Sequence, residues 1–179
     1  LREEAADAVR ELKEAGITKV VMMTGDSERT AAAIAKRVGV DEYYSEVLPE
    51  DKASFVEKEK ELGHKVIMIG DGINDSLALS SASVGIAISD GAAIAREIAD
   101  VTISADNLHE IVTLKRLSTA LMKRIHNNYR TIIGINGGLI ALGVTGIIMP
   151  TTSALLHNMS TLTISLRSMR NLLPKEEEA

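Results

Sequence analysis

The chain has 179 residues, enough for one domain of ordinary size or for a smaller domain with an appendage. It carries 25 acidic and 20 basic residues, and this balance, without a basic run interleaved with aromatics, argues against a nucleic-acid partner. There is no cysteine, which excludes disulfides and thiolate metal sites within the chain.

Helix-like and strand-like stretches alternate up to about residue 103. Amphipathic spacing predicts helices, and short apolar runs predict strands. The expected helices cover residues 2–15, 27–38, 51–62, 75–81 and 91–98, and the expected strands cover residues 19–23, 65–69, 83–88 and 100–103. Such alternation predicts an α/β fold with a parallel sheet and helices on both of its faces.

The first polar motif follows the apolar run at residues 20–23. Thr24, Gly25 and Asp26 come directly after this run. Open α/β sheets bind ligands at the carboxyl ends of their strands, so these residues are candidates for a binding site. A turn and helix cap would explain the same three residues if they stood alone.

The second candidate is Lys52, near the start of the helix expected at residues 51–62. Pro49 and the acids Glu50 and Asp51 mark that start and suit the helix dipole, but a lysine in the first turn does not. Its position makes best sense if it reaches an anion, and we interpret it as a phosphate ligand.

The most informative motif follows the apolar run at residues 66–69. Asp71, Asn74 and Asp75 lie there among glycines that let a ligand approach the backbone. Two closely spaced carboxylates at a strand end suit Mg²⁺ beside a phosphate. Asp71 could otherwise cap a turn, and Asn74 or Asp75 could cap the next helix. Phosphoryl transfer is nevertheless the chemistry that this motif indicates.

The composition changes after about residue 105. A basic, helix-prone stretch at 106–130 precedes a run without charge from Thr131 to Met149, close to the length that crosses a bilayer. A break at 150–153 leads to a second, more polar stretch that ends near residue 173. Because basic residues flank both outer ends, the sequence predicts a transmembrane hairpin with both ends cytoplasmic. A pair of buried helices in a soluble protein is the alternative.

These motifs together resemble the haloacid dehalogenase superfamily, and their fuller wording is similar to the phosphorylation domain of a P-type ATPase. The resemblance implies that Thr24 and Gly25 contact the phosphoryl oxygens, that Asp26 lies near the nucleotide and that Lys52 binds phosphate. It makes Asp71 a Mg²⁺ ligand, with Asp75 and Asn74 supporting the same site. Mg²⁺ and ATP are therefore the implied cofactors.

The phosphorylated aspartate of this family lies in an Asp-Lys-Thr-Gly-Thr motif, which the chain lacks. We therefore expect the chain to be the C-terminal part of a longer pump, inactive by itself and completed by a missing N-terminal part. Its expected parts are half of a Rossmann-like phosphorylation domain (1–105), a basic stalk (106–130), two transmembrane helices (131–173) and a cytoplasmic tail (174–179).

A single terminal hairpin resembles the heavy-metal-transporting branch of these pumps. The resemblance implies ATP-driven export of a divalent cation such as Zn²⁺, Co²⁺, Cd²⁺ or Ni²⁺ from a protein that passes several times through the plasma or inner membrane. It makes His157 a candidate ligand of the transported cation, although Asn158 and Met159 depart from the motif of zinc and cobalt relatives. Hydrogen bonding between helices is the alternative for His157, as it is for Asn136.

Two other functions stay open from the sequence. One is a soluble phosphatase of the haloacid dehalogenase type, which would need its own aspartate nucleophile and no membrane hairpin. The other is a non-catalytic membrane subunit of a pump, which would bind phosphate and Mg²⁺ or a partner chain without chemistry.

Overall fold

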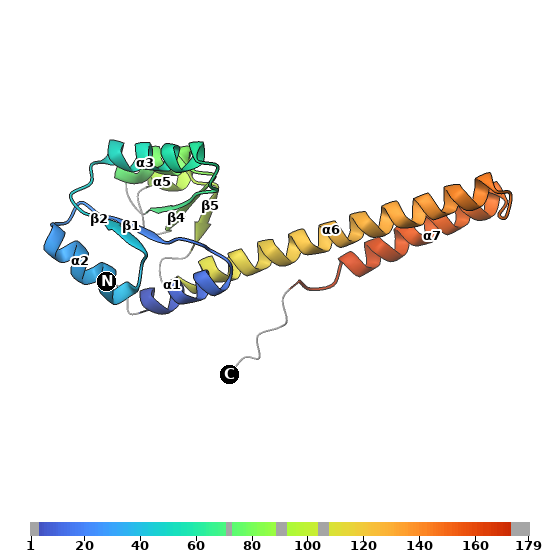
Figure 1. Ribbon diagram of the computed structural model, residues 1–179, viewed down its shortest axis with the longest axis horizontal. Helices are drawn as coiled ribbons and strands as arrows, with labels where there is room; N and C mark the ends of the chain where they lie inside the picture. Colours follow the sequence, from blue (N-terminus) through green and yellow to red (C-terminus); the bar gives the residue numbers. More distant parts are fainter. Residues whose placement is uncertain (1–3, 71–72, 89–92, 104–107, 173–179) are drawn as a thin grey trace. The chain divides into compact units, whose positions relative to one another are not determined.

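The computed structural model describes residues 4–70, 73–88, 93–103 and 108–172, and its contacts divide the chain into two units between Thr113 and Leu114. The first unit alternates helices and strands (Figure 1). Its helices are α1 (Ala5–Glu14), α2 (Glu28–Val38), α3 (Pro49–Glu61), the short 3-10 helix η1 (Ile73–Asp75), α4 (Ser76–Ser81) and α5 (Ala93–Ile98). Its strands are β1 (Val21–Met23), β2 (Glu42–Tyr44), β3 (Ile67–Gly70), β4 (Val84–Ile88) and β5 (Val101–Ile103).

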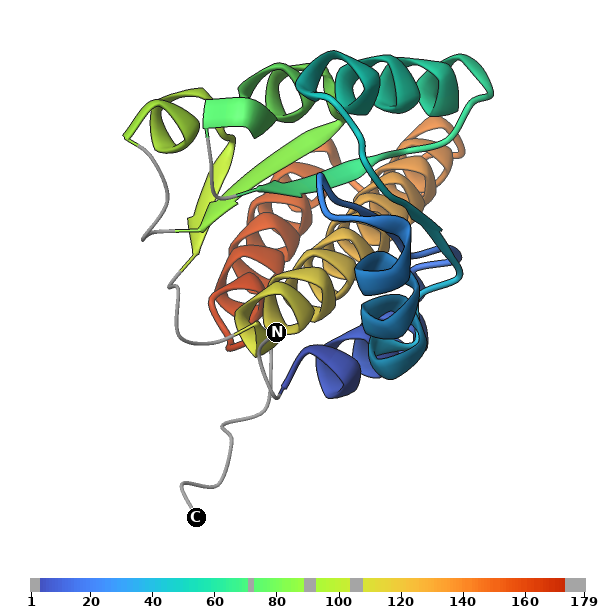
Figure 2. The same cartoon turned by 90° about the vertical axis from the view of Figure 1, so that its left-hand side faces the viewer.

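All the described strand pairs are parallel, as the sequence predicts. They form two sheets, however, where one was expected: β1 pairs with β2, and β4 lies between β3 and β5. Helices α3 and α5 cover one side of the strands, and α1 and α2 lie on the other side (Figures 1 and 2). The predicted bounds lie within a few residues of the observed ones, but β2 was not predicted.

The buried side chains follow the periods that the two kinds of element require. In α2, Ala31, Ala35 and Val38 are buried at helical spacing, and the helix ends at Gly39, whose φ of 79° is a left-handed cap. The central strand β4 buries Gly85, Ile86 and Ala87 in succession, as a strand covered on both faces should. This core fixes the strand ends from which the polar motifs project.

The second unit contains the helical hairpin. Helix α6 (His109–Val144) begins just before the boundary between the units and runs through the predicted stalk and most of the predicted first span without a break, and α7 is Pro150–Ser168. The Arg124 guanidinium donates to the backbone oxygens of Ser168 (2.9 Å) and Asn171 (3.0 Å), and Asn128 Nδ2 donates to the Ser168 hydroxyl (2.7 Å). Arg124 thereby satisfies carbonyls that the end of α7 leaves without helical partners.

The turn between α6 and α7 lies earlier than the sequence predicts. Residues 150–153, expected as the break, form the first turn of α7, with Pro150 as its first residue. Proline suits that position because its missing N–H would have no helical partner there. The chain reverses instead before Pro150, where Gly146 has a φ of 72°.

The two helices do not bear out the expected membrane spans. Among the described residues, no helix combines the length and the apolar character that a bilayer crossing requires. Glycines and polar side chains such as Asn136, Thr145, His157 and Ser160 lower the mean hydropathy of α6 and α7. In the described residues, the stretch predicted as two transmembrane helices (131–173) forms the end of α6 and the whole of α7.

Candidate functional site

The loop after β1 is held in place by its own side chains and by β2. The Thr24 hydroxyl donates to Asp26 Oδ2 (3.0 Å) and accepts from the Asp26 backbone N–H (3.1 Å). The Thr24 backbone N–H donates to the Tyr44 carbonyl, and the Val47 N–H donates to the Thr24 carbonyl, both at 3.0 Å. Thr24, Gly25 and Asp26 are thus presented at the carboxyl end of β1, as the sequence predicts.

Gly25 leaves the backbone of this loop open. A Cβ atom added there would meet nothing within 4 Å, so neither packing nor a positive φ explains the glycine. The exposed N–H groups of such a loop can approach an anionic ligand closely.

Lys52 and Asp75 form the most buried ion pair among the described residues. Lys52 Nζ lies 2.8 Å from Asp75 Oδ1, and the two side chains are 14% and 10% exposed. Lys52 comes from the first turn of α3, and Asp75 ends η1 just before α4. The anion that the Lys52 side chain reaches in the structure is therefore the Asp75 carboxylate. Asp75 lies beside Gly70 at the end of β3.

Gly70 explains why Asp75 can lie there. A Cβ atom added to Gly70, the last residue of β3, would come within 2.6 Å of Asp75 Cβ and 3.0 Å of Asp75 Oδ2. Real Cβ atoms do not approach so closely, so only glycine admits the Asp75 side chain against the strand end. From the sequence, Gly70 is expected only as one of the glycines of the motif, and this specific role was not predicted.

Two further predicted site residues, Asn74 and Asp71, belong to the segment after β3. Asn74 lies in η1 and is exposed, and Asp71 falls outside the described residues. Within the described ranges, no hydrogen bond joins the Thr24–Asp26 pair to the Lys52–Asp75 pair, and no group of three or more acidic or histidine side chains could hold a metal ion. The described residues thus form two separate pairs. Thr24 pairs with Asp26 after β1, and Lys52 pairs with Asp75 after β3.

A Mg²⁺ ion fits this donor set. The ion takes oxygen ligands and usually keeps several waters, so that one or two carboxylates and a phosphate suffice to hold it. Asp75 supplies one buried carboxylate, whose Oδ1 is already paired with Lys52. The lack of a larger acidic cluster in the described part of the chain is thus compatible with Mg²⁺.

His157 belongs to the second unit, where it joins the two long helices. Its Nδ1 lies 2.9 Å from Asn136 Oδ1, so α7 and α6 share a hydrogen bond at this level. This contact is the packing role that the sequence left open for both residues. The contact leaves Nε2 of the ring available for a second partner.

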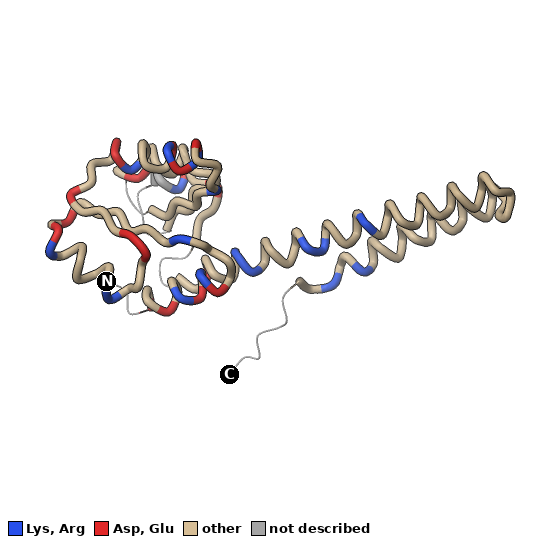
Figure 3. Tube along the Cα trace, viewed as in Figure 1, with Lys and Arg blue, Asp and Glu red and all other residues tan. Residues whose placement is uncertain are grey.

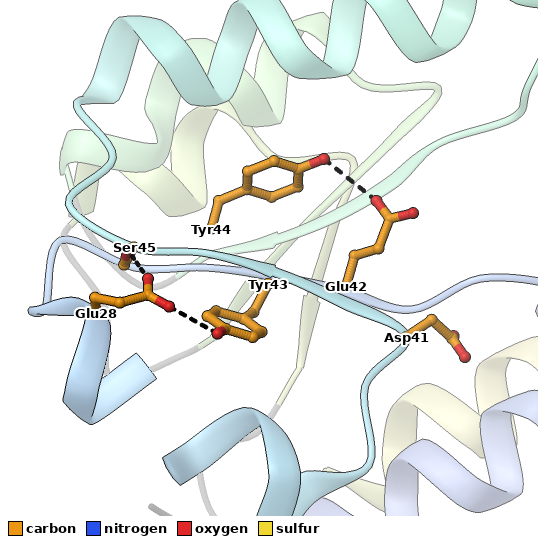
Figure 4. Close-up of a pocket in the computed structure, with 6 residues that line it drawn as sticks. All are labelled: Glu28, Asp41, Glu42, Tyr43, Tyr44 and Ser45. Atoms are coloured by element: carbon orange, nitrogen blue, oxygen red, sulfur yellow. Dashed lines mark hydrogen bonds between the residues drawn. The ribbon is translucent and has the colours of Figure 1, made fainter. Parts of the chain in front are cut away.

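A separate hollow of about 550 Å³ lies beside β2 and contains none of the predicted site residues (Figure 4). Glu28 is held there by the Tyr43 hydroxyl (2.7 Å) and the Ser45 hydroxyl (2.6 Å). These hydrogen bonds, Ser45 first, lower the pKa of Glu28, and Glu28 in turn raises the pKa of Tyr43. Sequence reasoning could not find this cluster, because it depends on the unpredicted strand β2.

The Tyr43→Phe variant should raise the pKa of Glu28, because it removes one of the two hydroxyl donors to the carboxylate. A carboxylate whose pKa is lowered by folding stabilises the fold above the pKa of the unfolded group, and this contribution is lost as the pH falls through the folded pKa. The variant should therefore retain less of this acid-sensitive stability. A ¹³C NMR titration of the Glu28 carboxyl measures the pKa, and Tyr44→Phe is the control, since Tyr44 donates to Glu42. An unchanged Glu28 titration in Tyr43→Phe would contradict the assigned contact.

Comparison with known proteins places this site in a family. Residues 1–83 match the family described as haloacid dehalogenase-like hydrolase. The chain is 37% identical over 95% of its length to the zinc-exporting P-type ATPase of Mycobacterium marinum and to the manganese-exporting P-type ATPase of Mycobacterium bovis. It is 36% identical over its full length to the copper-exporting P-type ATPase of Staphylococcus aureus. The chain spans 23% to 24% of the length of these relatives.

A comparison with solved structures also finds a P-type ATPase. A solved zinc-transporting PIB-type ATPase in its E2.Pi state superimposes with a TM-score of 0.89 at 34% identity, over 97% of this chain and 28% of that one. The fold of the α/β unit is thus of the haloacid dehalogenase type. More particularly, the chain belongs to the heavy-metal P-type ATPases, whose C-terminal part it matches.

Proposed function

We propose that this chain forms part of an ATP-driven pump that exports a divalent heavy-metal cation through a phosphoaspartate intermediate. The observation that carries the proposal is the buried Lys52–Asp75 pair at the carboxyl end of β3, with Gly70 shaped to admit it. A cation and a carboxylate held at a strand end suit the transfer of a phosphoryl group, because the developing charge needs groups that are already oriented.

In this proposal the chain supplies the groups around the phosphate. The Thr24 hydroxyl and the open backbone at Gly25 donate to phosphoryl oxygens, and Asp26 faces the nucleotide. Lys52 shares its charge between Asp75 and the phosphate. Asp71 and Asp75, with Asn74 in support, would hold Mg²⁺, which neutralises charge on the transferred group when bound.

The nucleophilic aspartate comes from another segment of the longer protein. This chain has no Asp-Lys-Thr-Gly-Thr motif, and the described strands form two separate sheets. Among the described strands, β3 pairs only with β4 and lies at the edge of its sheet, which leaves its other edge open to a further strand. By itself the chain therefore lacks the covalent step.

The proposed cargo is a divalent cation of the zinc, cobalt, cadmium or nickel class. The relatives with similar identity are named for zinc, manganese and copper, so overall likeness supports a heavy metal without choosing among them. A histidine ligand favours the borderline ions over Mg²⁺ or Ca²⁺. In the pump, the α/β unit would lie on the cytoplasmic side of the plasma or inner membrane.

The test is metal-dependent labelling of the longer protein that contains this chain. Incubation with γ-labelled ATP and Mg²⁺ should give an acid-stable phosphoenzyme that hydroxylamine removes, and Zn²⁺, Co²⁺, Cd²⁺ or Ni²⁺ should stimulate it. Labelling absent under every metal would overturn the proposal. If phosphate esters were then hydrolysed without ATP, the result would favour the phosphatase instead.

The His157→Ala variant should raise the metal concentration for half-maximal labelling about tenfold, since loss of one ligand or its support weakens metal affinity by that order. Labelling from inorganic phosphate should stay measurable, because His157 belongs to α7 of the second unit and the candidate phosphate-site residues belong to the first. His126→Ala is the matched control, as the His126 Nδ1 lies 2.8 Å from the Met122 carbonyl of its own helix. If the two variants showed the same metal dependence, His157 would not be a metal ligand and would serve only to pack against Asn136.

A further inference from the structure

The helical hairpin has a charge distribution unlike the rest of the chain. The chain carries a net charge of -5, yet residues 114–172 contain no aspartate or glutamate. The basic side chains of this stretch are Lys115, Arg116, Lys123, Arg124, Arg130, Arg167 and Arg170. Figure 3 shows them at the end of the hairpin away from its turn, which carries none. That end therefore attracts anions, whereas the turn does not.

Part of this basic end is a hollow between α6 and α7, with a volume of about 340 Å³. It is lined by Lys123, Arg124, Asn127, Asn128, Arg167 and Arg170, together with Ala120, Asn171 and Leu172. The first six of these side chains can all donate hydrogen bonds, and none of the lining residues is acidic. The lining thus suits a group with several acceptor oxygens.

The carbonyls at the end of α7 do not account for these cations. Arg124 already donates to the backbone oxygens of Ser168 and Asn171, which would otherwise attract basic side chains. Within the described ranges, Lys123, Arg167 and Arg170 have no acceptor or acidic partner of their own. Three cations therefore stand at the hollow with their charge available.

Exposed apolar side chains lie on the same stretches of α6 and α7 as the residues that line the hollow. Leu121, Met122 and Ile125 of α6 are 44%, 51% and 48% exposed, and Leu166 and Met169 near the end of α7 are 59% and 80% exposed. A free phosphate ion would have no use for these side chains. A phospholipid would, because its phosphate can lie among the cations while its acyl chains cover the apolar residues.

We propose that the hollow at Lys123, Arg167 and Arg170 binds the phosphate of an anionic phospholipid. The site requires only that this end of the hairpin meet the headgroup layer, whether or not the helices cross the bilayer. It is independent of Asp75 and Lys52, so the phosphoryl-transfer proposal and this one can fail separately.

The experiment measures how the whole 179-residue chain partitions onto vesicles, by co-sedimentation. Vesicles of phosphatidylcholine with one third phosphatidylglycerol are compared with vesicles of phosphatidylcholine alone. The triple variant Lys123→Ala/Arg167→Ala/Arg170→Ala is compared with Arg29→Ala/Lys36→Ala/Arg37→Ala, which removes three exposed cations from α2. Arg124 is left in place because it holds the end of α7.

Each Lys or Arg at an anionic membrane surface strengthens binding about fivefold, so the hairpin triple should lose roughly 100-fold in partition onto the anionic vesicles. The α2 triple should lose threefold or less, and phosphatidylcholine alone should bind neither variant measurably. Equal losses in the two triples would mean unspecific charge attraction and overturn the site. Displacement from the vesicles by millimolar inorganic phosphate would overturn the lipid as occupant.

If the hairpin triple loses helicity by circular dichroism, Lys123→Arg and Lys123→Gln replace it. Lys123→Arg should bind as the unmodified chain does, and Lys123→Gln should bind about fivefold more weakly at the same helicity. Equal binding of these two variants would overturn the role of the charge.

Discussion

The Lys52→Ala variant should lower the free energy of unfolding of the chain by about 3 kcal/mol. Removing one partner of a buried ion pair typically costs 3–5 kcal/mol, because the other charge stays behind without compensation. Asp75 is only 7% exposed, but the Lys52 side chain keeps 14% exposure, so we expect the lower end of this range. Urea unfolding followed by circular dichroism measures the change.

The ion pair can be separated from the loss of a side chain by two further variants. Lys58→Ala removes an exposed lysine from the same helix and should change stability by no more than about 0.5 kcal/mol. Lys52→Met/Asp75→Asn removes both charges and should recover most of the loss. If Lys52→Ala were no worse than Lys58→Ala, the pair would not stabilise the fold.

The same lysine should matter even more for chemistry in the longer protein. Loss of one oriented donor to a developing negative charge typically costs about 100-fold to 1,000-fold in rate. Lys52→Ala should therefore reduce the rate of phosphoenzyme formation by at least about 100-fold, measured by rapid-quench labelling at a temperature where the variant stays folded. Labelling at an unchanged rate would remove Lys52 from the phosphate site.

The sequence was sufficient to predict which polar residues come after the strand ends. Thr24 directly follows β1 and Asp75 comes shortly after β3, and an apolar run marks each of these strands in the sequence. The direct pairing of Lys52 with Asp75 could not be predicted in this way, because it depends on how α3 and η1 pack. The sequence position of Lys52 indicated an anion, but not which one.

Other features were missed for physical reasons that can be named. Strand β2 is three residues long and exposed throughout, so Glu42, Tyr43 and Tyr44 carry no alternating or apolar signal. The hollow around Glu28 was missed with it. In the hairpin, Pro150 was interpreted as a break although proline is also favoured at the first helical position, and only the turn geometry at Gly146 distinguishes the two.

Gly70→Ala should be strongly disruptive for a change of a single methyl group. The new Cβ atom would lie 2.6 Å from Asp75 Cβ and 2.9 Å from Asp75 Cγ, and the Asp75 side chain is held by Lys52 at 2.8 Å. Either β3 shifts or the ion pair opens, and overpacking of this kind costs about 1–3 kcal/mol before any loss of the pair. We expect about 3 kcal/mol in urea unfolding, with phosphoenzyme formation in the longer protein reduced as strongly as by Lys52→Ala.

A double-mutant cycle tests whether the collision with Asp75 is the cause. Asp75→Gly removes the Cβ atom that Gly70→Ala would strike, so adding Gly70→Ala to Asp75→Gly should cost less than about 1 kcal/mol. Gly25→Ala, where a new Cβ meets nothing within 4 Å, is the control for stability and should change it by less than about 0.5 kcal/mol. If Gly70→Ala cost the same with and without the Asp75 side chain, the glycine would be required for the backbone of β3 instead. Close approach to Asp75 would then not explain why this strand ends in glycine.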